Sequence, residues 1–275
     1  MEATCDVCFH HCKLKNGAWG LCRARKNEDG KIVCKNYGHI TSMALDPIEK
    51  KPLKMFCQGS KILSVGSYGC NLQCPFCQNH EISMAGQEDI GARYISPGEL
   101  VNEALYYEKM GNIGIAFTYN EPLISWEYVL DTSRLLHEQN MKSVLVTNGT
   151  VSFPIMEKLL PYIDAMNIDL KGFRDEYYKK LGGSLDAVKD VIKCAAAACH
   201  VELTTLIVPN ENDVLSEMEE EAKWIASVND SIPLHITRFF PRYNMQDREA
   251  TDVKRIHELK AVAERYLKNV FVGNC

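Results

Sequence analysis

The sequence lacks any apolar run that approaches the length of about eighteen residues needed for a membrane-spanning helix. It also lacks an excess of basic residues, since 31 Lys and Arg stand against 36 Asp and Glu and leave a formal net charge of −5. Internal repeats and low-complexity segments are absent, and the first residues, MEATCDVCFHHCKLK, lack the apolar core of a secretory signal. We therefore expect a cytoplasmic protein that binds neither a membrane nor nucleic acid.

Cysteine, in contrast, is frequent, with 12 among the 275 residues. In a reducing compartment such thiols favour metal ligation over disulfides. They form one group near the N-terminus, a second group between residues 70 and 77, and a scattered remainder that we expect to be ordinary, partly buried residues. The scattered cysteines are Cys34, Cys57, Cys194, Cys199 and Cys275.

From residue 61 onward, short β-branched runs alternate with amphipathic stretches of helical length. The predicted strands are 61–68, 113–119, 143–148, 165–170, 201–208, 234–239 and 270–273. The predicted helices are 97–110, 126–139, 154–160, 185–198, 215–227 and 252–267. A capping box with proline at the first helical position, Ser96-Pro97-Gly98-Glu99, opens the first of them.

This alternation predicts parallel strands covered by helices. It indicates an α/β fold of the partial (β/α)6 TIM-barrel type, with an open doubly wound sheet as the alternative. We expect two parts, a small N-terminal cysteine-rich module over residues 1–60 and the barrel over residues 61–275. In such a barrel the reactive groups lie on the loops that follow the strands.

The second cysteine group has C-x3-C-x2-C spacing and directly follows the first predicted strand. Four thiolates would complete the coordination of a zinc ion or of an iron-sulfur cluster, whereas three leave one metal position free for a ligand. The alternative is a structural zinc site that His80 completes. The three residues of this cysteine loop are Cys70, Cys74 and Cys77.

The same stretch, with the aromatic Phe76 just before the last cysteine, resembles the signature of radical S-adenosylmethionine (SAM) enzymes. The resemblance implies that the three thiolates hold a [4Fe-4S] cluster and that SAM binds its free iron. It also implies an enzyme that cleaves SAM reductively to a 5′-deoxyadenosyl radical, which abstracts hydrogen from a substrate. The cofactor then supplies the chemistry, while the protein supplies geometry and exclusion of water.

Further segments match the SAM-binding positions of that superfamily. TYNEP, residues 118–122, stands where Gly-Gly-Glu-Pro is common, and the resemblance assigns Glu121 to the ammonium of SAM and the backbone of Asn120 to the same ligand. It assigns the ends of the next two strands to the ribose and carboxylate, with a monovalent cation as a further component, and Phe76 to the adenine. The residues at those two strand ends are Thr147, Asn148, Asp169 and Lys171.

Each of these assignments has a structural alternative. Glu121 could be a carboxylate that stabilises a helix start, Asp169 and Lys171 could form an ion pair that caps a strand end, and Phe76 could belong to the core. Four further residues lie near predicted strand ends, where they could meet a substrate or serve the fold: His235, Arg238, Tyr243 and Tyr119.

Nearly the whole chain is similar to the radical SAM member of the AmmeMemoRadiSam system, a relative of pyruvate formate-lyase activating enzymes. The phrases that carry this similarity include DPIEKKPL, GCNLQCPFCQNHEIS, NIDLKGF and HITRFFP. It implies a small-molecule or peptide substrate, Memo-type and AMMECR-type partner proteins, and a flavodoxin- or ferredoxin-like electron donor. Two alternatives stay open, an activase that acts on a protein substrate to form a glycyl radical and a non-catalytic metal-binding regulatory module.

The first cysteine group has C-x2-C-x3-C-x9-C spacing and resembles the N-terminal cysteine module of that family. It could bind zinc or an auxiliary iron-sulfur cluster, and the spacing does not decide between them; a module without metal is the third alternative. We expect Arg23, Arg25 and Asn27 to anchor it to the barrel. The members of this N-terminal cysteine group are Cys5, Cys8, Cys12 and Cys22.

Overall fold

One eight-stranded sheet organises the protein, and the computed structural model describes every residue from Met1 to Cys275. Seven strands are parallel, whereas the edge strand β6 pairs with β7 in the antiparallel sense. In spatial order the strands are β14 (Val270–Gly273), β13 (Leu234–Arg238), β12 (His200–Ile207), β11 (Ala165–Asp169), β10 (Lys142–Thr147), β9 (Asn112–Phe117), β7 (Lys61–Gly66) and β6 (Ser42–Pro47).

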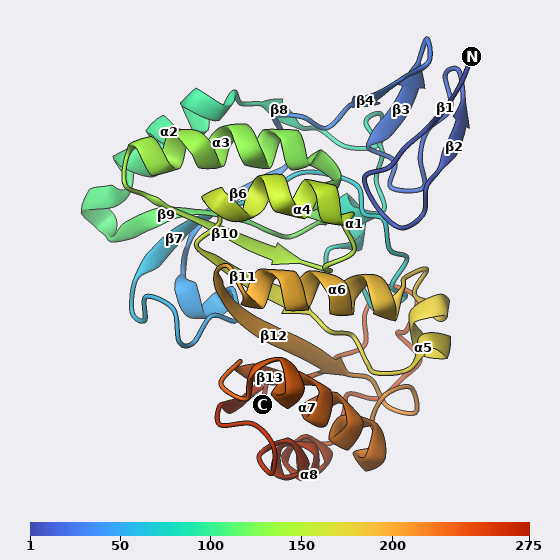
Figure 1. Cartoon of the computed structure of the whole chain (residues 1–275), viewed down its shortest axis with the longest axis vertical. Coiled ribbons are helices and arrows are strands. Elements are labelled where there is room, and N and C mark those ends of the chain that lie inside the picture. The colour runs from blue at the N-terminus through green and yellow to red at the C-terminus, as the bar shows by residue number, and fades with distance from the viewer.

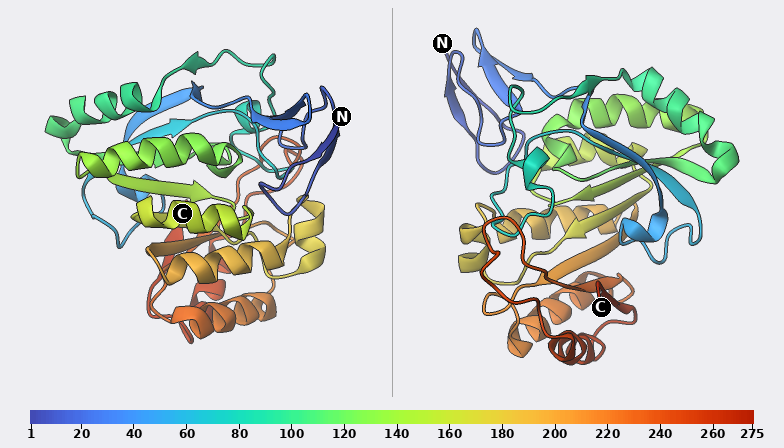
Figure 2. Two further views of the ribbon diagram at one scale, coloured as in Figure 1. Left: turned by 45° about the horizontal axis from the view of Figure 1, so that its top comes forward. Right: turned by 180° about the vertical axis from the view of Figure 1, so that it is seen from behind.

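The seven parallel strands are those predicted from the sequence, with ends that differ by one or two residues. Because their spatial order follows the chain order, the sheet has no point at which the direction of winding reverses, unlike a doubly wound sheet. The helices accordingly lie on one side of the sheet (Figure 1), and the view from behind shows the strands in front of them (Figure 2). The arrangement is that of a partial barrel, with β6 and β14 as its edges.

The helices between the strands also match the prediction. They are α2 (Pro97–Tyr106), α3 (Trp126–Glu138), α4 (Phe153–Leu159), α6 (Leu185–Ala196), α7 (Leu215–Asn229) and α8 (Val253–Ala263). Two short helices were not predicted, α1 (His80–Ser83) and α5 (Asp175–Lys180), and the 3-10 turns are η1 (Ile48–Lys50), η2 (Glu108–Met110), η3 (Pro122–Ser125) and η4 (Leu160–Tyr162). No helix combines the length and the apolar composition that a membrane span requires.

Helix α2 begins as the sequence predicts, with Ser96 as its N-cap. The Ser96 hydroxyl accepts a hydrogen bond from the Glu99 backbone N–H at 3.3 Å, and the Ser96 N–H donates to the Glu99 carboxylate at 2.8 Å. Between helices and sheet, 47 buried residues form the main core. A smaller cluster, which includes Ile48, Leu53 and Ile62, closes the end of the barrel where the parallel strands begin.

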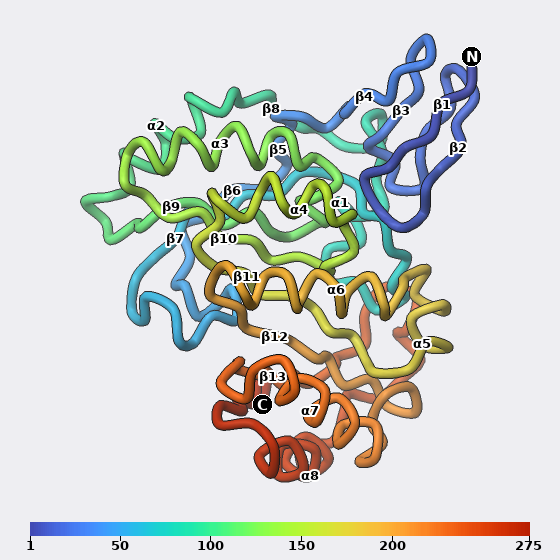
Figure 3. The backbone as a smooth tube through the Cα atoms, viewed as in Figure 1, coloured from blue at the N-terminus to red at the C-terminus, as the bar shows by residue number.

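The N-terminal segment contributes small antiparallel hairpins beside the barrel. Its strands are β1 (Glu2–Thr4), β2 (Lys13–Lys15), β3 (Arg25–Glu28) and β4 (Lys31–Cys34), while β5 (His39–Ile40) pairs with β8 (Arg93–Tyr94). The tube in Figure 3 places this segment beside the start of α4. The division at residue 60 stays a prediction, although β6, which precedes it, already belongs to the main sheet.

Candidate functional site

The cysteine loop leaves β7 and enters one large cavity of about 780 Å³. Cys70, Cys74 and Cys77 all line this cavity, and all three are free thiols. Burial raises the pKa of Cys74 to about 11, while the ammonium of Lys171 acts in the opposite direction. A positively charged metal centre would shift the same equilibrium strongly toward the thiolate.

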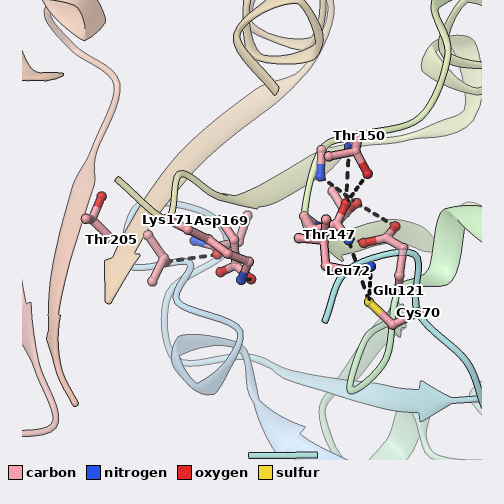
Figure 4. Close-up of polar contacts among 12 residues, drawn as sticks. Cys70, Leu72, Glu121, Thr147, Thr150, Asp169, Lys171 and Thr205 are labelled. Atoms are coloured by element: carbon pink, nitrogen blue, oxygen red, sulfur yellow. Dashed lines mark hydrogen bonds and ion pairs between the residues drawn. The ribbon is translucent and has the colours of Figure 1, made fainter. Parts of the chain in front are cut away.

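Two hydrogen-bond donors converge on the sulfur of Cys70 (Figure 4). The backbone N–H of Leu72 lies 3.4 Å from Sγ, and Nδ2 of Asn148 lies 3.8 Å from it. Such donors stabilise negative charge on a sulfur and tune the reduction potential of a cluster bound to it. The loop therefore offers three thiols and a polar setting for the charge of their ionised forms.

No group of three or more His, Cys, Asp or Glu side chains is arranged to hold a single metal ion. A [4Fe-4S] cluster makes a different demand, because each thiolate binds a different iron and the sulfurs stand farther apart than around one ion. His80, the alternative fourth ligand, begins α1 and stacks on Tyr243 with ring centroids 4.5 Å apart.

Glu121 follows β9 and is almost fully buried at the cavity wall, with 3% of its surface exposed. Its carboxylate accepts hydrogen bonds from the Thr147 hydroxyl at 2.7 Å, the Asn148 N–H at 2.7 Å and the Leu123 N–H at 2.9 Å. Burial raises the pKa of Glu121 to about 7, against these donors, which lower it. The carboxylate thus caps the start of η3, which was the alternative role expected for Glu121, and the residue also lines the cavity.

The loop after β10 brings Thr147 and Asn148 to the same wall. Gly149 has φ of 68°, and a Cβ there would lie 2.7 Å from Cγ2 of Ile168, so this turn requires glycine. The turn directs the Asn148 N–H at Glu121 and its side-chain amide at the cysteine loop.

The end of β11 carries Asp169 and Lys171, which form an ion pair at 2.8 Å. The backbone N–H of Lys171 donates to the Tyr178 hydroxyl at 3.0 Å, which fixes the turn. The ion pair exists, as the alternative reading of these two residues expected, and both side chains also line the cavity, as the reading as a ligand site expected. Burial acts to lower the pKa of Lys171, but the ion pair with Asp169 holds it well above its usual value, so its ammonium stays charged.

Phe76 lines the cavity and is also buried in a cluster with Leu72 and Phe239. The Asn120 side chain has a role that the sequence did not predict. Its Oδ1 accepts from the Ser67 N–H at 2.9 Å and its Nδ2 donates to the Gly69 carbonyl at 3.0 Å, so it clamps the start of the cysteine loop.

A second unpredicted feature is a polar network on the opposite wall. Lys51 forms an ion pair with Asp46 at 2.9 Å, and the Tyr119 hydroxyl donates to Asp46 at 3.0 Å. Tyr119 has φ of 70° and lines the cavity with Lys51. The sequence feature that could have revealed this network is the DPIEKKPL phrase, residues 46–53, which contains both Asp46 and Lys51. His235 and Arg238 also line the cavity.

The N-terminal cysteine group is drawn together beside this site. Cys5, Cys8 and Cys22 are buried, and the Cys5 N–H donates to the Cys12 carbonyl at 2.9 Å. Burial raises the pKa of Cys8 to about 11, and the neighbouring thiols Cys22 and Cys5 act in the same direction.

Arg25 anchors the N-terminal segment to the barrel, as predicted. Its Nε donates to the Ile124 carbonyl at 2.6 Å, and its two terminal nitrogens bind the Glu127 carboxylate at 2.7 and 2.5 Å. Asn27 instead bonds within the segment, to the Leu14 carbonyl at 2.7 Å, and Nη1 of Arg23 is buried without a hydrogen-bond partner.

Comparison with known proteins places this geometry among described families. A family model described as the Radical SAM superfamily matches residues 64–225, more than half of the chain. The uncharacterized protein MJ0808 of Methanocaldococcus jannaschii is 37% identical over 276 residues, which cover 99% of this chain and 81% of that protein.

Two further similarities concern a protein named for its activity and a structure named for its bound ligand. The pyruvate formate-lyase-activating enzyme of Clostridium pasteurianum is 25% identical, with 74% of this chain and 88% of that protein covered. The crystal structure of Streptococcus suis SuiB bound to S-adenosylmethionine superposes with a TM-score of 0.58 and 15% identity, over 76% of this chain and 48% of that one. The latter likeness concerns the fold.

Proposed function

Because the chain belongs to the radical SAM superfamily, whose members are enzymes that bind a [4Fe-4S] cluster and SAM, we propose that Cys70, Cys74 and Cys77 hold that cluster here. The observation that carries the proposal is the convergence of all three thiols on one cavity. The ends of β9, β10 and β11 supply its remaining polar walls, and these are the positions at which a barrel binds its ligands.

When bound and reduced, the cluster supplies the electron that cleaves SAM to a 5′-deoxyadenosyl radical, which abstracts hydrogen from the substrate. The chain holds the ligand for this step. The Glu121 carboxylate, in its ionised form, attracts the SAM ammonium, and three donors from the protein fix its orientation. The Asn148 and Leu72 donors stabilise the Cys70 thiolate.

The remaining contacts follow from the residues around the cavity. The residues that would approach the ribose and carboxylate of SAM are Thr147, Asn148, Asp169 and Lys171. The Lys171 ammonium would offer charge complementarity to the carboxylate. The Asp169 carboxylate is 34% exposed, which leaves it accessible to a monovalent cation. Phe76 and the Asn120 backbone complete the site, beside the adenine and the methionyl group respectively.

We infer that the substrate is a small molecule or a peptide, with Memo-type and AMMECR-type proteins as partners. The support is the resemblance of the sequence motifs to the AmmeMemoRadiSam enzymes and a part of the cavity wall that none of the SAM contacts proposed above uses. That wall contains Lys54 and Arg238, neither of which has a carboxylate partner within salt-bridge distance.

A second candidate function is activation of a glycyl radical enzyme, which the similarity to pyruvate formate-lyase-activating enzyme favours. Either reaction requires an electron donor, for which we propose a flavodoxin- or ferredoxin-like protein, and a reducing, cytoplasmic location. We further propose that the N-terminal cysteine group, whose thiols lie close enough to influence one another's pKa, binds an auxiliary cluster or zinc. Zinc would require the thiols to move closer together, because no three of them are arranged around a single ion.

Anaerobic reconstitution tests the function. The wild-type chain should bind iron and sulfide at the cysteine loop and release 5′-deoxyadenosine from SAM in the presence of a reductant. Replacement of Cys70, Cys74 or Cys77 by Ala should remove both properties. Cys194→Ala, on α6, is the matched control and should retain them. A wild-type loop that takes up zinc and never a cluster would contradict the proposal.

The two substrate readings are separated by isotope transfer. SAM cleavage is run with a glycine-containing peptide deuterated at Cα, and separately with small-molecule extracts plus Memo-type and AMMECR-type proteins. Deuterium in 5′-deoxyadenosine from the peptide alone would favour the activase. Product that requires the partner proteins would favour the first reading.

A further inference from the structure

Three buried side chains beside the cysteine loop form a closed ring of hydrogen bonds. The Asn148 amide donates to Oδ1 of Asn71 at 2.9 Å, the Asn71 amide donates to the Thr150 hydroxyl at 2.8 Å, and that hydroxyl donates to Oδ1 of Asn148 at 2.6 Å. Their exposed fractions are 4%, 5% and 1% for Asn71, Asn148 and Thr150. Each partner therefore has a fixed donor and acceptor role.

The ring decides which end of the Asn148 amide faces Cys70. Oδ1 of Asn148 accepts from both the N–H and the hydroxyl of Thr150, so the NH₂ group must lie on the other side. There it donates to Asn71 and lies 3.8 Å from the sulfur of Cys70. The backbone N–H of Asn148 binds Glu121 at the same time, so the ring supports the cluster ligand and the SAM-facing carboxylate together.

Asn71 also touches the N-terminal cysteine group. Nε2 of His10 lies 2.8 Å from the Asn71 carbonyl, and the Asn71 side chain lines the same narrow crevice as Cys8. The backbone of Cys8 pairs with that of Val151, the residue after Thr150, in an isolated antiparallel β-bridge. Cys8, Asn71, Thr150 and Glu121 line one crevice that is too small to admit water.

We propose that Asn71 is a positioning residue that couples the N-terminal cysteine group to the radical SAM site. The inference rests on the proposed function. A change in the ligation of Cys8 moves the Asn71 amide and, through it, the Asn148 side chain. This movement changes the hydrogen bond from the Asn148 amide to Cys70 and the one from the Asn148 backbone N–H to Glu121. The cluster potential and the affinity for SAM thereby depend on the state of the N-terminal group.

The first test compares Asn71→Ala with Asn112→Ala in the reconstituted full chain. Asn112 is also buried and bonds the Leu63 N–H and the Ala104 carbonyl, both at 2.8 Å, and it lines neither the cavity nor the crevice. In Asn71→Ala the Asn148 amide loses the acceptor that holds it beside Cys70, so its donation to the sulfur should weaken. The midpoint potential of the cluster should then fall, measured by redox titration with electron paramagnetic resonance. SAM binding should weaken about two- to tenfold, the range expected for one hydrogen bond.

The folded Asn112→Ala variant should keep the wild-type midpoint potential and the wild-type affinity for SAM. If Asn71→Ala does not fold, Thr150→Val removes the ring hydroxyl while keeping the side-chain shape, and the same shifts are expected. Wild-type potential and affinity in the ring variant that folds would overturn the proposal. Because wild-type SAM cleavage is measured in the same series, a wild type without cleavage identifies a failure of the proposed function instead.

The coupling itself requires a double-variant cycle. Cys8→Ala should shift the cluster potential in the wild-type background, while the iron content of the cysteine loop stays unchanged. In the Asn71→Ala background the same change should have little further effect, because the connection is already lost. Additive shifts, or no shift from Cys8→Ala in either background, would show that the two cysteine groups act independently.

Discussion

Lowering the pH from 7 to 6 should weaken SAM binding about fivefold, because the ionised fraction of Glu121 falls from about one half to about one tenth. The window follows from the raised pKa of about 7, which burial produces against the donors Asn148, Thr147 and Leu123. Protonation removes the negative charge that attracts the SAM ammonium. Above pH 7 the amine of SAM itself begins to lose its proton, so the useful range ends there.

Glu121→Gln should abolish this pH dependence and weaken binding by roughly ten- to a hundredfold at pH 7, the loss expected for a charge-assisted hydrogen bond of about 1.5 to 3 kcal/mol. The structure adds a second consequence. The Gln amide would bring an NH₂ group against the Asn148 N–H, which now donates to the carboxylate at 2.7 Å. We therefore expect a lower melting temperature as well.

Anaerobic isothermal titration of SAM into the reconstituted protein measures the effect, with iron content and melting temperature as controls. The iron content should be the same in both proteins, because Glu121 does not bind the thiols. Wild-type affinity that is flat between pH 6 and 7 would refute the reasoning. So would a folded Glu121→Gln variant with the wild-type pH profile.

Three further outcomes are expected. Replacing Cys5 and Cys8 together by Ala should remove metal from the N-terminal group and leave SAM cleavage at least partly intact; complete loss of SAM binding in the folded variant would argue against separate sites. Gly69→Ala should lower the melting temperature more than Gly17→Ala, because both glycines have φ above 80° but only at Gly69 would a Cβ lie 2.4 Å from the Cys22 carbonyl; equal melting temperatures would contradict this contact. Acid should destabilise the wild type more than the Glu202→Gln variant between pH 4.5 and 2. Burial acts to raise the pKa of Glu202, but the hydrogen bonds from His200, His235 and the loop N–H groups outweigh it and lower this pKa to about 2. The stability that this group contributes is present above pH 4.5, amounts to about 3 kcal/mol and is lost as the pH falls; parallel acid-unfolding curves of the two proteins would contradict it.

The parallel strands were predictable because each is a β-branched run followed by a helix-length amphipathic stretch, as in Ser143–Asn148 before α4. Strand β6 was not, because its sequence SMALDP lacks alternation and it lies at the edge of the sheet. Helix α5 was missed because its six residues are too few to show a helical period.

The residues around the candidate site were predictable from motifs at strand ends, but their partners were not. Nothing in TYNEP shows that Glu121 will accept from residues of the next loop, or that the Asn120 side chain will clamp Gly69. Such pairings depend on how the strand ends meet in space. For the same reason the ring of Asn71, Asn148 and Thr150 has no signature in the sequence.

The residues that surround Cys70 in the fold are far from it in the sequence, and this distance matters during synthesis of the chain. Asn148 follows Cys70 by 78 residues, and Glu127 follows its partner Arg25 by 102. At roughly 5 to 20 residues per second, the ribosome exposes the cysteine thiols for several seconds before the donors that surround them exist. During that interval the nascent chain can capture any thiophilic metal. We therefore expect assembly of the cluster to follow translation.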